Sequence, residues 1–329
     1  MKYPTIIMLG CLFASGAIGR SDAVLAAERK AKVLRIGHTL AEDSHYGVGL
    51  KKFAELVKAK TDGTLHVEVS GNSKLGNERD LIEGVSLGTI EMCLVSTGTI
   101  PSFSKEFMVF DLPFIVQDRK KIYRTLDGET GREMLDSLGG KGIKGMVFFE
   151  NGFRNITDSR RPINTPADLA GLKIRVMENP VHLETFRVLG ANASPMPFGE
   201  LFTALQQKIM DGQENPLFII KTSRFHEVQK YLALTEHVYS PAVMMIGNRV
   251  YAGLTGAQRK ALMDAAREAR DFERKFIIDN ENRIIAELKR AGMVVTSPDK
   301  AVFRKAVEPV YRKFEAEIGK ALIDKVRDS

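Results

Sequence analysis

Arg175 is the side chain whose type and position point most directly to binding chemistry. It lies in Gly171-Leu-Lys-Ile-Arg-Val-Met-Glu-Asn-Pro180, where the surrounding apolar residues predict a strand. Because strand side chains alternate between faces, Lys173 and Arg175 share one face and their apolar neighbours share the other. A buried guanidinium is costly unless it is paired, and its planar fork suits a bidentate carboxylate. The residue types therefore predict an anchor for a carboxylate ligand, with a structural salt bridge as the alternative.

Two further segments could bring polar groups to the same ligand. Glu150-Asn-Gly-Phe-Arg-Asn-Ile-Thr157 puts Arg154 at the end of a predicted strand, where a glycine lets the backbone turn. Asp211-Gly-Gln-Glu-Asn-Pro216 has the composition of a polar turn after a helix. Such a turn could present the amide of Asn215 to a ligand. We therefore predict a polar binding site built from residues 150–220.

Motifs for catalysis, phosphate binding and metal binding lack their required context. Gly140-Lys-Gly-Ile-Lys-Gly145 matches G-x-G-x-x-G, but a helix precedes it and a strand follows, the reverse of the dinucleotide fingerprint. Ser102-Phe-Ser-Lys105 matches S-x-x-K without the S-D-N and K-T-G partners of that site. The six histidines show no paired zinc-site spacing. We predict no catalytic residue, no metal and no cofactor.

The composition is that of an ordinary globular protein. The chain has 329 residues, of which 44% are hydrophobic and 27% charged, which excludes long disorder, collagen-like repeats and a multi-spanning membrane protein. The length favours two domains. The 48 Lys and Arg residues exceed the 41 Asp and Glu residues, giving a formal charge of +7, but the two signs interleave. Because a nucleic-acid binder normally carries a basic stripe or a recognisable motif, we predict no nucleic-acid partner.

Residues 1–27 have the pattern of a secretory signal peptide. Lys2 supplies the positive n-region, Thr5 to Gly19 is an apolar stretch of 15 residues, and Val24-Leu-Ala-Ala27 offers small residues for cleavage. The alternative is a membrane anchor, but a spanning helix needs roughly 20 apolar residues. Cleavage removes Cys11 and leaves Cys93 as the single cysteine, so the exported chain has no internal disulfide. We expect Cys93 to be a small buried hydrophobe.

Short apolar runs alternate with helical patterns, which is typical of an α/β architecture. We predict strands over 33–37, 65–69, 91–95, 142–149, 172–177 and 191–194, and helices over 48–60, 78–87, 181–189 and 198–208. Thr255 and Gln258 form a capping box that opens a helix with one-face apolar spacing for over thirty residues. Such a helix is about 50 Å long, so it either bridges two lobes or kinks. Two further amphipathic helices are expected over 300–326.

Several motifs, at matching spacing, resemble the solute-binding proteins of TRAP transporters, the DctP-like family. The resemblance runs from about Val33 to the long helix. Two departures from the family pattern are Lys208, where a glycine is usual, and Val250-Tyr251, where Phe-Trp is common. The matching motifs are Leu75-Gly76, Glu78-Arg79, Leu87 to Ile90, Asp111 to Phe114, Glu150 to Thr157, Asp168 to Arg175, Ala204 to Gln207 and Asp211 to Pro216.

The resemblance implies an α/β, two-lobed periplasmic-binding-protein fold of class II, with a long helix spanning both lobes and the ligand in the cleft between them. We expect residues 1–27 to be the signal peptide and residues 28–152 plus 241–280 to form lobe I. Residues 153–240 plus 281–329 then form lobe II and the C-terminal helices.

The resemblance also assigns roles to individual residues. It implies that Arg175 forms a bidentate salt bridge with the substrate carboxylate, and that Arg154 and Asn215 add polar contacts. On the other wall of the cleft, the segments that line it in relatives contain His38, Glu78 and Ser96.

The implied function is that of a monomeric periplasmic protein that captures a small organic acid and delivers it to the integral-membrane subunits of a TRAP permease. One alternative is a sensory module for a receptor kinase, and another is a periplasmic enzyme that uses Arg175 to anchor small acids. C4-dicarboxylates and sugar acids such as uronates satisfy the same arginine. Because Glu78 could accept from hydroxyl groups but would repel a second carboxylate, the residues favour a hydroxylated acid.

Overall fold

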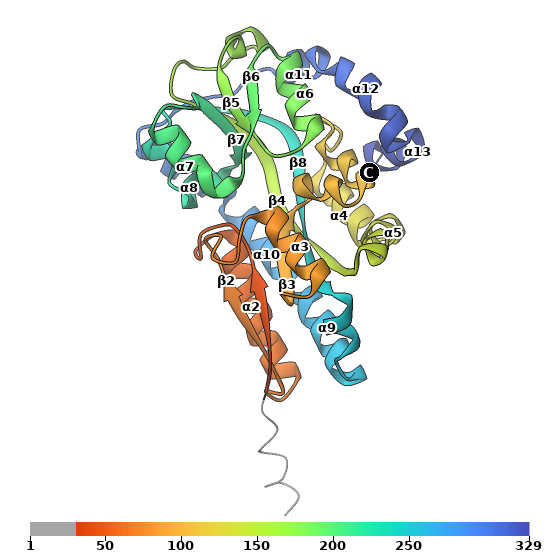
Figure 1. Cartoon of the computed structure of the whole chain (residues 1–329). Helices are drawn as coiled ribbons and strands as arrows, with labels where there is room; N and C mark the ends of the chain where they lie inside the picture. Colours follow the sequence, from red (N-terminus) through yellow and green to blue (C-terminus); the bar gives the residue numbers. More distant parts are fainter. Residues whose placement is uncertain (1–30, 329) are drawn as a thin grey trace, which may run out of the picture.

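The computed structural model describes residues 31–328, so the predicted signal peptide over 1–27 lies outside the described residues. Helices and strands alternate along the described chain (Figure 1). The strands are β1 (Lys32–Gly37), β2 (Leu65–Ser70), β3 (Met92–Ser96), β4 (Ile143–Asp158), β5 (Lys173–Val176), β6 (Asn192–Pro195), β7 (Gly212–Pro216), β8 (Tyr231–Gly247) and β9 (Val294–Thr296). The α-helices are α2 (His45–Lys60), α3 (Glu78–Leu87), α4 (Arg119–Asp127), α5 (Glu129–Ser137), α6 (Pro180–Val188), α7 (Phe198–Gln206), α8 (Leu217–Thr222), α9 (Asn248–Ala252), α10 (Gly256–Arg290), α11 (Lys300–Ala306), α12 (Glu308–Ile318) and α13 (Lys320–Arg327).

These strands form one continuous sheet in the order β2-β1-β3-β8-β4-β7-β5-β6, with β9 beside β8. The strands β2, β1 and β3 run parallel at one end, and β7, β5 and β6 run parallel at the other. Between these two wings lie the long antiparallel strands β4 and β8. Parallel pairing needs crossover helices, so each wing carries its own helices. The result is two α/β lobes, at the top and bottom of Figure 1, that share β4 and β8.

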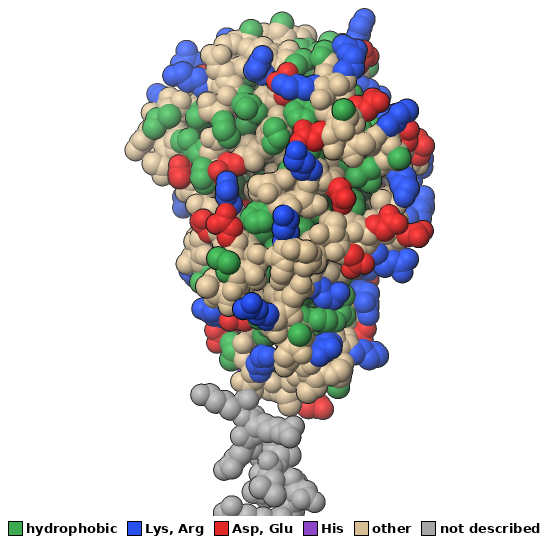
Figure 2. All heavy atoms as spheres, turned by 45° about the vertical axis from the view of Figure 1, so that its right-hand side comes forward, with side chains coloured by type: hydrophobic (Ala, Val, Ile, Leu, Met, Phe, Trp, Pro, Cys, Tyr) green, Lys and Arg blue, Asp and Glu red, His purple; other side chains and the backbone are tan. Residues whose placement is uncertain are grey.

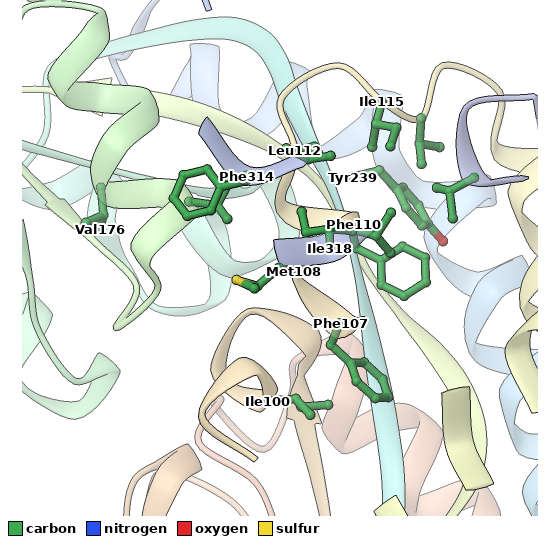
Figure 3. Close-up of a cluster of buried hydrophobic side chains, with 14 of the residues drawn as sticks. Ile100, Phe107, Met108, Phe110, Leu112, Ile115, Val176, Tyr239, Phe314 and Ile318 are labelled. Carbon is green, nitrogen blue, oxygen red and sulfur yellow. The ribbon is translucent and has the colours of Figure 1, made fainter. Parts of the chain in front are cut away.

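Two clusters of buried apolar side chains cover the two faces of the sheet. Alternate residues of β8 divide between them, with Val243 and Met245 in one cluster and Met244 in the other, as strand alternation requires. Cys93 is a buried free thiol in the first cluster, which confirms the prediction, and burial raises its pKa. Figure 3 shows part of this first cluster, with labelled side chains that include Ile100, Phe107, Met108, Phe110, Tyr239 and Phe314.

The long helix α10 confirms the prediction of a helix that spans both lobes. It contains 35 residues, which corresponds to about 50 Å. Its N-terminus has the predicted capping box, in which the Thr255 side chain accepts a hydrogen bond from the Gln258 amide. The helix packs against α2 in one lobe, α8 in the other, and β4 between them.

Strand β4 is longer than its sequence suggested. It was expected to end before Glu150, with a turn at the following glycine, but it continues to Asp158 because β7 and β8 pair with its second half. Gly152 has a φ of +123° and lies opposite Ser240, at a shift in the β4–β8 register. The glycine therefore makes a bulge inside the strand, and Arg154 lies in the strand interior instead of at its end.

The segment over 211–216 is a strand, so the prediction of a polar turn was wrong. Gly212–Pro216 forms β7, and every residue of it is buried between β4 and β5. Its polar side chains are satisfied by hydrogen bonds within the sheet. Gln213 Nε2 donates to Thr157 Oγ1 at 2.8 Å, and Asn215 Nδ2 donates to Gln213 Oε1 at 2.5 Å. Polar composition suggested a turn because these partners come from distant segments.

Two other local features concern the number of C-terminal helices, which differs from the prediction, and the backbone conformation of Lys208. The C-terminal region contains three helices instead of two, because Gly319, with a φ of +93°, separates α12 from α13. Lys208 has a φ of +59°, which lies in the left-handed region that favours glycine. This backbone conformation accounts for the glycine that the family usually has at this place.

Charged side chains of both signs are interspersed over the face of the molecule in Figure 2, without a stripe of one sign. Pairs along the exposed side of α10 follow the same pattern, such as Lys260 with Asp264 at 2.6 Å and Lys275 with Asp279 at 2.7 Å. Among residues 31–328, no helix combines the length and apolar character needed to cross a membrane.

Candidate functional site

A pocket with an empty volume of about 290 Å³ lies between the two lobes, beside β4. Five of the six predicted site residues line it, and only His38 does not. The lining residues are Thr39, Leu40, Tyr46, Glu78, Ser96, Asn151, Arg154, Arg175, Met177, Phe198, Asn215 and Ile219.

Arg175, from β5, contributes a buried guanidinium that is 3% exposed. Its Nε and Nη2 donate to the carbonyl oxygen of Met196 at 2.8 and 2.6 Å. Nη1 has no hydrogen-bond partner, and no ion pair forms to Arg175 among the described residues. Burial lowers the pKa of Arg175 to about 10, against the attraction of Glu214. Nη1 and the second hydrogen of Nη2 are therefore free for two parallel bonds to a carboxylate.

Arg154, from β4, lines the same pocket but is already paired. Its Nε donates to Glu214 Oε2 at 2.5 Å and its Nη2 to Glu214 Oε1 at 2.8 Å. Both side chains are 0% exposed. Although burial opposes it, Arg154 and His182 hold the pKa of Glu214 well below its ordinary value. Only Nη1 of Arg154 lacks a partner within the described chain. Arg154 therefore forms a structural salt bridge, the role that the sequence predicted as the alternative for Arg175. Arg175 itself forms no such bridge within the described residues.

Asn215, from β7, is fixed by two neighbours. Its Oδ1 accepts from Arg154 Nη2 at 3.2 Å, and its Nδ2 donates to Gln213. The amide is 3% exposed and lines the pocket. Its orientation is therefore set before any ligand contacts it.

A buried network extends from Glu214 away from the pocket. His182 Nδ1 lies 3.5 Å and His237 Nε2 lies 3.3 Å from its carboxylate, and His182 Nε2 lies 3.0 Å from Asp111 Oδ1. Burial lowers the pKa of His237, whereas Glu214 and Asp111 outweigh burial and raise the pKa of His182. This network of charges was not predicted, because its members are far apart in the sequence.

Glu78 lies on the opposite wall, at the first residue of α3. Asn77 and Asp80 form a capping box that fixes this helix start. Glu78 is 9% exposed. Its carboxylate oxygen Oε1 accepts a hydrogen bond from the backbone amide of Ser96 at 2.8 Å. Burial raises the pKa of Glu78 to about 7, although Arg175 draws it downward.

Ser96, at the end of β3, belongs to an uncharged hydrogen-bonding group. Its Oγ lies 2.9 Å from Ser240 Oγ, and Asn151 Nδ2 donates to both hydroxyls at 3.3 Å. All three side chains are buried. This part of the wall can exchange hydrogen bonds with neutral polar groups of a ligand.

His38 lies behind the pocket wall, not on it. It is 1% exposed, and its ring is 6.2 Å from the ring of Tyr46, centroid to centroid. Burial lowers its pKa to about 4, so the imidazole is neutral at neutral pH. The segment after β1 instead lines the pocket with Thr39 and Leu40.

Seven of the lining residues were not singled out from the sequence: Thr39, Leu40, Tyr46, Asn151, Met177, Phe198 and Ile219. Asn151 stands within the 150–157 motif, and Phe198 follows a proline at the start of α7, so both had a local signal. Thr39 and Leu40 directly follow His38, and Met177 lies in the 171–180 segment, whereas Tyr46 and Ile219 carry no local pattern. Within the described residues, no group of His, Cys, Asp and Glu side chains is arranged to hold a metal ion.

This chain is similar to bacterial solute-binding proteins over most of its length. A family model described as bacterial extracellular solute-binding protein, family 7 (DctP), matches residues 36–317. A solute-binding protein of Verminephrobacter eiseniae is 41% identical over 90% of this chain and 89% of its own length. The 2,3-diketo-L-gulonate-binding periplasmic protein YiaO of Escherichia coli is 37% identical over the same shares.

Solved structures agree with the two-lobed arrangement. A TRAP periplasmic solute-binding protein of Polaromonas bound to D-erythronate superposes with a TM-score of 0.88, with 42% identity over 90% of this chain and 98% of that chain. A sugar-acid-binding protein of Advenella mimigardefordensis in complex with galactonate gives 0.88, with 41% identity over 91% and 97%. A TRAP solute-binding protein of Sulfurospirillum deleyianum with bound succinate gives 0.87, with 30% identity over 91% and 99%. The predicted α/β two-lobed fold is thus confirmed.

Proposed function

The chain belongs to the bacterial extracellular solute-binding proteins of family 7, and from this premise we propose that it captures a small organic acid between its lobes and delivers it to a TRAP-type membrane permease. Arg175 clamps the ligand carboxylate. Asn215 and the free Nη1 of Arg154 add polar contacts from the same lobe, and Glu78 and Ser96 act from the other.

The observation that carries this proposal is the partly unused guanidinium of Arg175. A buried cation without a protein counter-ion is unfavourable, so a carboxylate that enters the pocket removes an existing penalty. Hydrogen bonds to charged groups contribute about 1.5–3 kcal/mol each. Two parallel bonds from Nη1 and Nη2 would therefore supply much of the affinity for a small acid.

The ligand class follows from the proteins to which this chain is similar. Their bound or named ligands are D-erythronate, galactonate, 2,3-diketo-L-gulonate and succinate. All are small carboxylates. We therefore propose a sugar acid or a C4-dicarboxylate as the ligand of this protein.

The site of action that we propose is the periplasm. The predicted signal peptide over 1–27 and the periplasmic relatives support export. The permease partner is proposed from the TRAP proteins among the similar structures. The protein would transfer its ligand unaltered, as a carrier and not as an enzyme.

We further propose that lobe I comprises residues 28–152 plus 241–280, and that lobe II with the C-terminal helices comprises residues 153–240 plus 281–329. The boundaries at 152/153 and 240/241 coincide with the bulge where Gly152 faces Ser240. The C-terminal helices brace both lobes, because Tyr311 Oη of α12 donates to the Pro113 carbonyl at 2.7 Å. We also propose that the protein acts as a monomer.

A thermal-shift screen tests the proposal. The purified protein is heated with a library of sugar acids and dicarboxylates, and with uncharged polyols of the same carbon number as matched controls. A ligand that binds only the folded form raises the melting temperature. We expect at least one acid to raise it and its polyol counterpart to leave it unchanged. The proposed function would be contradicted if the polyols raised the melting temperature as much as the acids did, or if no acid raised it.

A further inference from the structure

Among residues 31–328, three charged side chains line the pocket: Arg154, Arg175 and Glu78. The first is compensated by Glu214 through two hydrogen bonds, at 2.5 and 2.8 Å. One uncompensated cation and one carboxylate therefore face the ligand. They come from opposite lobes, since Arg175 is on β5 and Glu78 begins α3.

Glu78 forms no salt bridge with an arginine among the described residues. Its carboxylate oxygen Oε1 accepts a hydrogen bond from the Ser96 amide, at 2.8 Å. An ionised carboxylate has about four acceptor positions and no donor. Its remaining positions can only be satisfied by groups that donate, and the pocket side of Glu78 is where the ligand lies.

The neutral groups beside Glu78 have the same preference for hydroxyls. The phenol of Tyr46 is buried without a hydrogen-bond partner in the described structure, and it lines the pocket. Ser96 adds a hydroxyl already grouped with Ser240 and Asn151. A ligand hydroxyl both donates and accepts, so it can satisfy a carboxylate and a phenol together. A second ligand carboxylate has no donor to offer and carries the same charge as Glu78.

We infer that Glu78 is a specificity-determining residue, which makes the site selective for hydroxylated monocarboxylates and excludes dicarboxylates. This inference rests on the proposed function, because it assumes that Arg175 holds the first carboxylate. Glu78 then accepts from hydroxyls at the other end of the ligand. Among the similar structures, hydroxylated monocarboxylates are bound at 41–42% identity, and at 30% identity both galacturonate and succinate are bound.

The test compares two acids of equal carbon number, D-erythronate and succinate, by titration calorimetry at about pH 8, above the pKa of Glu78. Erythronate carries a hydroxyl at C4, where succinate carries its second carboxylate, and further hydroxyls at C2 and C3. For the wild-type protein we expect erythronate to bind at least about 100-fold more tightly than succinate, the scale of a buried like-charge contact.

Two substitutions at the same position separate charge from shape. Glu78→Gln keeps an oxygen that can accept the hydrogen bond from the Ser96 amide but removes the charge. We expect succinate to bind this variant more tightly, so that the preference for erythronate over succinate falls at least about tenfold. Glu78→Asp keeps the charge on a shorter side chain and should still exclude succinate. Circular dichroism melts confirm that both variants are folded before titration.

The outcomes separate this inference from the proposed function. If the wild type binds succinate as tightly as erythronate, or if Glu78→Gln leaves their ratio unchanged, the role of Glu78 is refuted while acid binding stands. If the wild type binds neither these two acids nor any acid of the thermal-shift library, the proposed function itself fails and takes the inference with it.

Discussion

The surroundings of Arg154 and Arg175 form two regions of one pocket that share a residue type and a degree of burial but differ in what completes them. The two arginines are 0% and 3% exposed. Arg154 meets a carboxylate of the protein, Glu214, in a bidentate pair. Arg175 meets only the Met196 carbonyl and keeps Nη1 without a partner in the described structure. The source of the counter-charge therefore separates the two residues: Arg154 is neutralised by Glu214, and we propose that Arg175 is neutralised by the carboxylate of a ligand.

The largest effect should come from breaking the first region. Glu214→Gln leaves the guanidinium of Arg154 buried without its counter-charge, and removing one partner of a buried ion pair typically costs about 3–5 kcal/mol. We expect the free energy of unfolding to fall by this order in a denaturant titration. A loss below about 1 kcal/mol would mean that the Arg154–Glu214 pair does not stabilise the fold.

A substitution of Arg175, in the second region, should weaken ligand binding without lowering the stability of the fold. Arg175→Lys retains the charge but loses the planar fork, so we expect the dissociation constant of the bound acid to rise by about 10- to 100-fold. The melting temperature without ligand should stay close to that of the wild type, since no ion pair is lost. Unchanged affinity in calorimetry would argue that the carboxylate does not use the fork.

The pH dependence of stability sharpens the contrast between the walls. The pKa of Glu78 is raised from 4.5 to about 7 in the folded protein. The folded state thus binds more protons than the unfolded state between these values, and stability falls as pH rises through this window. The groups that face Glu78 are Arg175 on β5, Arg154 on β4 and Tyr46 on α2.

Glu78→Gln removes this titration. Without ligand at about pH 8, the variant should be more stable than the wild type by on the order of 1 kcal/mol, and the difference should vanish at about pH 4. Melting curves across this range provide the measurement. A wild type and a variant with parallel pH profiles would contradict the buried, uncompensated state of this carboxylate.

The smallest effect is expected from the neighbour of Arg175 on the same strand. Lys173 is exposed, and its side chain lies outside the pocket. Lys173→Met should change stability by less than about 0.5 kcal/mol and leave acid binding intact. Lys173→Met is therefore the matched control for substitutions at Arg175. If it also lost acid binding, the positive charge of the strand and not a direct contact from Arg175 would account for the affinity.

The sequence predicted the parts of the molecule that depend on local pattern. The alternation of strands and helices, the length of α10 and its capping box, and the burial of Cys93 all follow from spacing and residue type. The strand β7 did not, because its polar side chains resemble those of a turn until Thr157 and Arg154 of β4 satisfy them.

The same limit applies to the candidate site. Arg154 and Arg175 were both identified, but the sequence could not distinguish them, since Glu214 reaches Arg154 across 60 positions of the chain. His38 was expected on the wall and lies behind it, because the chain after β1 turns Thr39 and Leu40 toward the pocket. Partners that meet only through the sheet leave no local signal.

The most direct test of carboxylate binding by Arg175 is a calorimetric titration of Arg175→Met with the acid that stabilises the wild type most strongly. Methionine fills similar space without charge or donors. Because two charge-assisted hydrogen bonds are lost, we expect the variant to bind the acid at least about 100-fold more weakly. Without ligand, it should melt no lower than the wild type. Binding within about threefold of the wild type, by a folded variant, would contradict the claim that Arg175 holds the carboxylate.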